Sequence, residues 1–124
     1  MSKKKILVID DDPKMVKVVA ARLEASGYGT MTANDGLQGL EIAKNEQPDL
    51  ILLDIKMPNM DGHTMMRNLK KFGEKTRTIP VIILTGYDGL DDLFGLEGAV
   101  DYIVKPFDHR DLLLRIRNVL KRCG

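Results

Sequence analysis

The chain has 124 residues, of which 44% are apolar and 30% are charged, so we expect residues 1–124 to form one ordered globular domain. The formal net charge of +1 argues against bulk electrostatic attraction to nucleic acid or to an anionic membrane, and we expect no direct nucleic-acid binding and no membrane partner. The one cysteine, Cys123, cannot form an internal disulfide, and no apolar run is long enough to span a bilayer, which favours a cytoplasmic protein.

The first third of the chain predicts two strands and two helices. Residues 6–9 are an apolar run that ends in three aspartates, and Asp12–Pro13 is a favourable helix start because Asp is a good N-cap and Pro suits the first helical position. The buried face of this helix is expected to consist of Met15, Val18, Val19 and Leu23. Residues 28–33 predict a weaker strand, and a second helix follows the turn at residues 34–36, with Leu37, Leu40 and Ala43 on its buried face.

The middle of the chain contains the most apolar predicted strand, residues 50–53, which ends at Asp54. An apolar run of this length bounded by turn residues is typical of a strand that is covered on both faces. Asp61 is the expected cap of a third helix, and the methionines at 57 and 60 are interpreted as loop and core filling. The buried stripe of that helix is expected to consist of Met65, Met66, Leu69 and Phe72.

The last part of the chain begins with a polar loop over residues 70–78 and a buried strand over residues 81–84, which ends at Thr85. Residues 86–98 carry four glycines and predict a short fourth helix, because an interior glycine costs about 1 kcal/mol of helix stability. A fifth strand over residues 100–104 leads to Lys105. The final helix follows Asp108, and its buried stripe is expected to consist of Leu112, Leu113, Ile116, Val119 and Leu120.

This alternation predicts an α/β fold with a single doubly wound, five-stranded parallel sheet and helices on both faces. The strands that begin at Ile6, Leu50 and Val81 are the most apolar, so they should be central, which gives the flavodoxin-like strand order 2-1-3-4-5. Ligands bind such sheets at the carboxyl ends of the strands that flank the switch point. The side chains expected at that edge are Asp10, Asp11, Asp54, Thr85 and Lys105.

Three carboxylates at one edge require compensation of their charge. Each like-charged pair at ~4 Å costs ~4 kcal/mol at an effective dielectric constant of 20, so a pKa must rise or a cation must bind. Lys105 supplies one positive charge, and Mg²⁺ is the expected cofactor because the available ligands are all oxygens. Phosphate is then the expected substrate, with Thr85 as a hydrogen-bond donor and a carboxylate as the nucleophile that attacks phosphorus.

Four segments, taken in order, carry a specific resemblance: ILVIDDDP, LILLDIKMPNMDG, VIILTG and DYIVKPF. Along essentially its whole length the chain resembles a response-regulator receiver domain of two-component signalling, in the CheY-like superfamily. The resemblance implies that Asp54 is the phosphoacceptor and takes a phosphoryl group from a phosphohistidine. It also implies that Asp11 binds Mg²⁺ directly and that Asp10 contacts the ion through a water molecule. The backbone carbonyl of Lys56 would be the remaining protein ligand.

The resemblance further implies a conformational switch. Thr85 matches the hydroxyl that moves onto the phosphoryl group, Tyr102 matches the aromatic side chain that turns inward with it, and Lys105 matches the partner of the acyl phosphate. The surface formed by the fourth helix, fifth strand and fifth helix would change for partner binding. In the family the bond that matches Lys105–Pro106 is cis.

The expected partners are a sensor histidine kinase or a histidine phosphotransfer protein, and a downstream protein or output domain, with the chain a monomer or a phosphorylation-dependent dimer. We expect that the chain is not an enzyme, apart from catalysing its own phosphorylation and dephosphorylation. The alternative is an aspartyl-phosphate hydrolase of the haloacid-dehalogenase type, but Lys56 stands where those enzymes place a second acid. A flavodoxin-like nucleotide binder is disfavoured because no glycine-rich loop follows the first strand.

Overall fold

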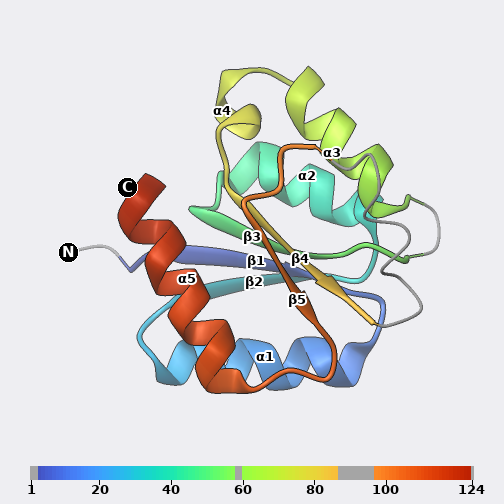
Figure 1. Ribbon diagram of the computed structural model, residues 1–124. Helices are drawn as coiled ribbons and strands as arrows, with labels where there is room; N and C mark the ends of the chain where they lie inside the picture. The colour runs from blue at the N-terminus through green and yellow to red at the C-terminus, as the bar shows by residue number, and fades with distance from the viewer. Residues whose placement is uncertain (1–2, 58–59, 87–96, 124) are drawn as a thin grey trace.

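The computed structural model describes residues 3–57, 60–86 and 97–123, and Figure 1 shows their arrangement. Strands and helices alternate from the first strand to the third helix, as the sequence predicts, and a second short helix then precedes the fourth strand. In order they are β1 (Lys5–Ile9), α1 (Pro13–Ala25), β2 (Gly29–Ala33), α2 (Gly36–Glu46), β3 (Leu50–Asp54), α3 (Gly62–Lys71), α4 (Glu74–Arg77), β4 (Val81–Thr85), β5 (Asp101–Val104) and α5 (His109–Cys123).

The five strands form one sheet in the order β2-β1-β3-β4-β5, and every neighbouring pair is parallel. The predicted strand order is therefore confirmed. β3 lies at the centre, and all five of its residues are buried, including Asp54 at its carboxyl end. Burial on both faces explains why this strand is a continuous apolar run and does not alternate with polar residues.

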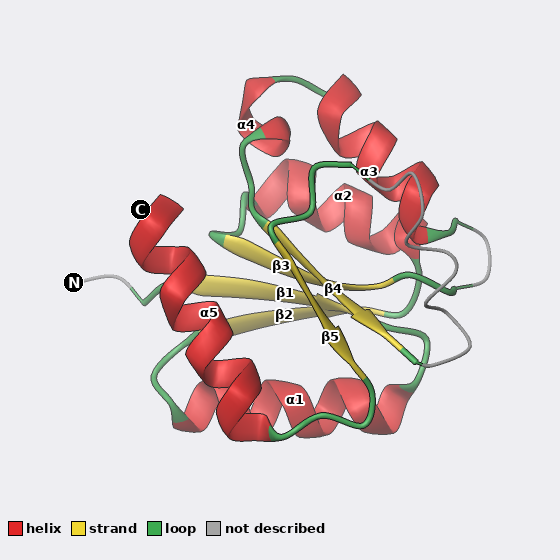
Figure 2. Ribbon diagram, viewed as in Figure 1, coloured by secondary structure: helices red, strands yellow, loops and turns green. Residues whose placement is uncertain are grey.

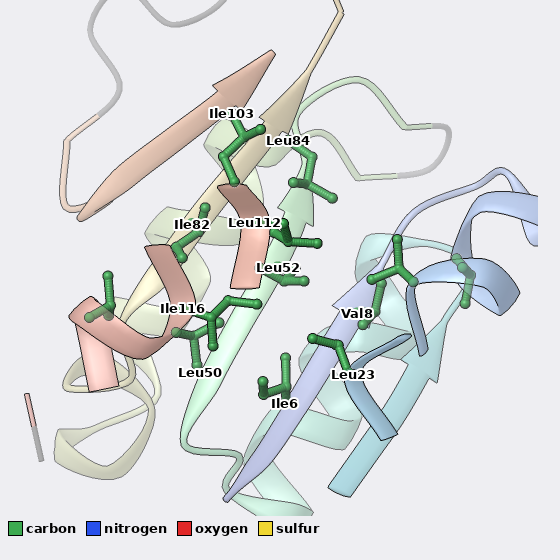
Figure 3. Packing of buried hydrophobic residues seen from close by; sticks show 13 residues of the cluster. Ile6, Val8, Leu23, Leu50, Leu52, Ile82, Leu84, Ile103, Leu112 and Ile116 are labelled. Atoms are coloured by element: carbon green, nitrogen blue, oxygen red, sulfur yellow. The ribbon is translucent and has the colours of Figure 1, made fainter. Parts of the chain in front are cut away.

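Helices α1 and α5 cover one face of the sheet, and α2 and α3 cover the other (Figure 2). Because successive side chains of a strand point to opposite faces, Ile6 and Val8 pack under α1 and α5, whereas Leu7 and Ile9 pack under α2 and α3. Figure 3 shows the first of these two clusters, in which Leu23 of α1 and Ile116 of α5 meet the strand side chains.

Aspartate side chains cap the amino ends of the long helices. Asp12, Asp35 and Asp61 each accept a hydrogen bond from a backbone N–H in the first turn of α1, α2 and α3. Asp108 accepts a bond of 2.8 Å from the backbone N–H of Arg110 at the start of α5. These caps satisfy N–H groups that have no partner within the helix, and they confirm the predicted starts of α1, α3 and α5.

Three residues predicted to be buried are exposed. Val18 lies on the outer side of α1, because the buried residues Val16, Val19 and Leu23 have i, i+3, i+7 spacing and Val18 falls opposite them. Leu37 is likewise exposed on α2, where Gly36, Gly39, Leu40 and Ala43 form the buried face. Phe72 follows the last residue of α3 and is exposed, with the ammonium of Lys44 4.4 Å from its ring centroid.

The segment predicted as a polar loop over residues 70–78 contains the four-residue helix α4. Its position is set by Thr76, which is buried and whose hydroxyl donates a hydrogen bond of 2.6 Å to the carbonyl of Leu69. The short fourth helix predicted between residues 86 and 98 falls largely on residues 87–96, which lie outside the described residues. Within the described part of the chain, no helix has the length and apolar character needed to cross a membrane.

Candidate functional site

The register of the sheet brings the carboxyl ends of β1 and β3 side by side. Ile9 pairs with Leu53, so the next residues, Asp10 just after β1 and Asp54 at the end of β3, lie side by side. On the other side of β3, Asp54 pairs with Leu84, so Thr85 lies one residue beyond it on β4. Parallel strands end at the same edge, and this is the edge at which the sequence predicts a site.

Asp10, Asp11 and Asp54 form a cluster at this edge. One carboxylate oxygen from each lies within 4.8 Å of the others. Asp10 is fully buried and Asp54 is 6% exposed, whereas Asp11 is exposed to solvent. The structure therefore brings together the three carboxylates that the sequence predicts as metal ligands, with two of them withdrawn from water and the third facing it.

Lys105 lies between the two buried carboxylates. Its ammonium is 2.8 Å from Oδ2 of Asp10 and 3.6 Å from Oδ2 of Asp54. Asp10 also accepts a hydrogen bond of 3.0 Å from the backbone N–H of Asp12, and the backbone N–H of Lys105 donates one of 2.6 Å to the carbonyl of Thr85. Asp10 therefore accepts hydrogen bonds from two donors, and the backbone of Lys105 is hydrogen-bonded to the last residue of β4.

Burial, which is the largest effect, and the nearby charge of Asp10 together raise the pKa of Asp54 from 3.8 to about 7, against a smaller opposing effect of Lys105. Burial by itself lowers the pKa of Lys105. The hydrogen bond to Asp10 and the charges of Asp54 and Asp10 outweigh that effect, so the net pKa of Lys105 is raised. The edge therefore carries more negative charge than its one ammonium neutralises.

The donor set suits a hard divalent cation. Carboxylate oxygens completed by water are typical Mg²⁺ ligands, and three carboxylates beside one ammonium leave two negative charges for the ion to balance. Lys56 follows in the chain, and its backbone N–H donates a hydrogen bond of 3.3 Å to Oδ1 of Asp54. Its carbonyl remains a predicted ligand.

The two residues predicted to act as a switch lie on the neighbouring strands β4 and β5. Thr85 is buried, and its hydroxyl donates a hydrogen bond of 3.1 Å to the carbonyl of Gly86. Tyr102 lies on the edge strand β5 and is 53% exposed. The peptide bond between Lys105 and Pro106 is cis, as the family resemblance implies.

Contacts between elements outside the cluster were not predicted from the sequence. Arg115 on α5 forms ion pairs with Asp101 of β5 at 2.8 Å and with Asp111 at 3.0 Å, and of these only the i, i+4 spacing of Asp111 and Arg115 is visible in the sequence. The backbone of Met60 packs closely on Gly36 at the start of α2. The sequence carries no local signal for a contact between residues so far apart in the chain.

Comparisons with family models, curated sequences and solved structures agree on one family. Residues 6–117 match the family model described as the response regulator receiver domain. A receiver domain protein (CheY-like) from Methanospirillum hungatei JF-1 is 35% identical, with a TM-score of 0.89 over 98% of this chain and 97% of that one. The probable transcriptional regulator ycf27 of Porphyridium aerugineum is 44% identical over 98% of this chain but only 50% of its own length.

The relatives correct one expectation. The chain is 42% identical, over 95% of its length, to the DNA-binding dual master transcriptional regulator RpaA of a Synechocystis strain, so the expectation that direct nucleic-acid binding plays no part is wrong for proteins of this kind. The expectation rested on a net charge of +1, and that charge describes a chain that spans about half the length of the curated relatives it matches. The net charge of this chain carries no information about the part of those relatives that it does not match.

Proposed function

Because this chain belongs to the response regulator receiver domain family, we propose that it accepts a phosphoryl group on Asp54 from a phosphohistidine of a kinase. Receiver domains are signalling modules and not classical enzymes. We propose that the module extends over residues 1–124 and that any catalysis is limited to its own phosphorylation and dephosphorylation. The family assignment leaves the haloacid-dehalogenase alternative without support.

The observation that carries the proposal is the position of Asp54 beside a second buried carboxylate and an ammonium, at the carboxyl edge of the sheet. A carboxylate oxygen of Asp54 forms a bond to phosphorus as the phosphorus–nitrogen bond to the donor histidine breaks, and the electron pair stays on the imidazole nitrogen. Lys105 lies within reach of an oxygen of the incoming group, because its ammonium is already 3.6 Å from Asp54.

Asp10, Asp11, Asp54 and the carbonyl of Lys56 would hold Mg²⁺. Bound there, the ion would neutralise charge that develops on the phosphoryl oxygens. Asp10 keeps its hydrogen bond to Lys105 and so holds the ammonium in place for the same purpose. The low solvent exposure of Asp10 and Asp54 strengthens each of these charge interactions.

The proposed signal is a movement of Thr85. Its hydroxyl now donates to the carbonyl of Gly86, and an acyl phosphate on Asp54 would offer a charged acceptor in place of that neutral one. Exchange of this partner would vacate the space beside β5, into which Tyr102 would turn from its exposed position. The surface formed by β5 and α5, with the segment that precedes β5, would change for a downstream partner.

The test is the intact mass of the protein after incubation with a small acyl-phosphate donor and Mg²⁺. Wild type should gain one phosphoryl group, and Asp54→Asn should gain none. Asp12→Asn is the matched control, because this acid stands beside the cluster but is exposed, and Asn also caps a helix well. Equal labelling of wild type and Asp54→Asn would overturn the assignment of Asp54.

A further inference from the structure

Residues 55–57 and 60–61, the described part of the connection between β3 and α3, include the predicted carbonyl ligand and are held by contacts on both sides. At its start, the backbone N–H of Lys56 donates to Asp54. At its close, the backbone N–H of Gly62 donates a hydrogen bond of 2.9 Å to the carbonyl of Ile55. Between these points, Met57 and Met60 both pack against the hydrophobic cluster under α2 and α3.

Met60 rests directly on Gly36. A Cβ atom added to Gly36 would lie 2.7 Å from Cβ of Met60 and 2.8 Å from its carbonyl oxygen, closer than such atoms approach in proteins. Gly36 is helical and is not among the described glycines with positive φ, so its backbone conformation suits other residues as well. The absence of a side chain at Gly36 is therefore required by the proximity of Met60 and not by a turn.

The same contact connects the segment to the strand that carries Asp10. Gly36 begins α2, three residues after Ala33 ends β2, and the carbonyl of Ala33 accepts a hydrogen bond of 3.2 Å from the backbone N–H of Asp10. On its other side, Met60 is held by α3, because the side-chain amide of Asn68 lies 3.5 Å from its sulfur. Met60 is thus fixed between α2 and α3. Helix α2 in turn follows β2, whose last residue is hydrogen-bonded to Asp10.

We propose that Gly36 is a positioning residue for Mg²⁺ binding, acting through Met60 to hold the carbonyl of Lys56 beside Asp10, Asp11 and Asp54. The inference rests on the proposed function, since it assumes that Mg²⁺ binds at this cluster. Neither Gly36 nor Met60 touches the ion or the phosphoryl group. Groups that orient metal ligands in this way typically alter affinity by 10- to 100-fold when they are changed.

The test measures binding of Mg²⁺ alone to the whole chain by calorimetry, with backbone amide shifts of residues 55–62 as a second readout. Gly36→Ala should bind Mg²⁺ roughly tenfold more weakly than wild type while it still unfolds cooperatively, because Ala favours helix at this position. Gly29→Ala is the matched control. A Cβ there would meet its nearest atom, Cγ of Lys5, at an ordinary 3.6 Å, so its affinity should equal that of wild type.

The rate of phosphorylation by a small donor distinguishes an effect on Mg²⁺ positioning from a general structural defect. At saturating Mg²⁺, Gly36→Ala should reach the maximal rate of wild type, and only the Mg²⁺ concentration for half-maximal rate should rise roughly tenfold. Wild-type affinity in Gly36→Ala would overturn the inference and leave the proposed function intact. Absence of Mg²⁺ binding by wild type would instead overturn the proposed function.

A second variant keeps the inference testable if Gly36→Ala does not fold. Met60→Ala removes the side-chain atoms beyond Cβ, including the sulfur near Asn68 that holds this residue to α3, and keeps the Cβ and carbonyl oxygen that lie closest to Gly36. It should also weaken Mg²⁺ binding and shift the amide signals of residues 55–62. Unchanged affinity in Met60→Ala would overturn the inference.

Discussion

Replacement of Asp54 by Asn should change how the stability of the protein depends on pH. Asn has the same shape, its side-chain oxygen can still accept from the backbone N–H of Lys56, and Lys105 keeps its ion pair with Asp10 at 2.8 Å. The substitution therefore removes one ionisable group and leaves no charge without a partner. The variant therefore differs from wild type mainly in lacking the proton that Asp54 can bind.

The sign follows from the raised pKa. Asp54 titrates at about 7 in the folded protein and near its ordinary 3.8 in the unfolded chain, so between these values the folded state binds the extra proton. The contribution of Asp54 to the free energy of unfolding therefore falls as pH rises from about 4 to about 7, by at most ~1.4 kcal/mol per pH unit, and is level above that range. The full shift corresponds to roughly 4 kcal/mol as an upper bound, since relaxation around a buried charge reduces such penalties.

The assay is urea unfolding followed by far-ultraviolet circular dichroism, because the chain contains no tryptophan. With a chelator present, Asp54→Asn should have nearly the stability of wild type at about pH 4 and exceed it by about 2–4 kcal/mol at about pH 8. Asp12→Asn, an exposed acid, is the control and should follow wild type. A difference that stays constant with pH within the error of extrapolation, or that grows in the opposite direction, would refute the reasoning.

Three further substitutions test contacts at the site and in the core by urea unfolding. Lys105→Met should lower the free energy of unfolding by about 3 kcal/mol at neutral pH, because Asp10 would remain buried without its ion-pair partner; a loss below about 1 kcal/mol would contradict this. Gly39→Ala should lower the free energy of unfolding by about 1–3 kcal/mol, because the new Cβ would lie 2.5 Å from Cδ1 of Ile9. Ile9→Val removes that Cδ1 atom, so the double variant should recover part of the loss, and additive losses would contradict the contact. Ile116→Ala should cost about 2–5 kcal/mol by opening a cavity, equally with and without Mg²⁺; a loss that depends on the ion would be inconsistent with its place in the core.

The features that the sequence predicts well are those with local causes. Three of the five strands, β1, β3 and β4, are strongly apolar runs, and the strand order follows from placing these three at the centre of the sheet. Helix starts were marked by single aspartates such as Asp12 and Asp61. The cluster at Asp54 followed from strand order alone, because parallel strands end at one edge.

The features that the sequence does not reveal depend on distances between remote elements. Val18 is as apolar as Val16, and only the direction in which α1 meets the sheet decides which of them is buried. Helix α4 is too short for a periodic pattern, and it depends on the hydrogen bond from Thr76 to Leu69. The contact between Gly36 and Met60 is a matter of tenths of an ångström.

The division of the core by the sheet bears on how sequences of this fold can diverge. The side chains between the sheet and helices α1 and α5, including Ile116 of α5, make one cluster, and those between the sheet and helices α2 and α3, including Met65 of α3, make the other. Effects of substitutions couple strongly between residues in contact and add when they are separated, so compensating changes should arise within one cluster and rarely between the two. One half of the interior can therefore be exchanged, in evolution or by design, while the half that holds Gly36 and Met60 keeps its residues.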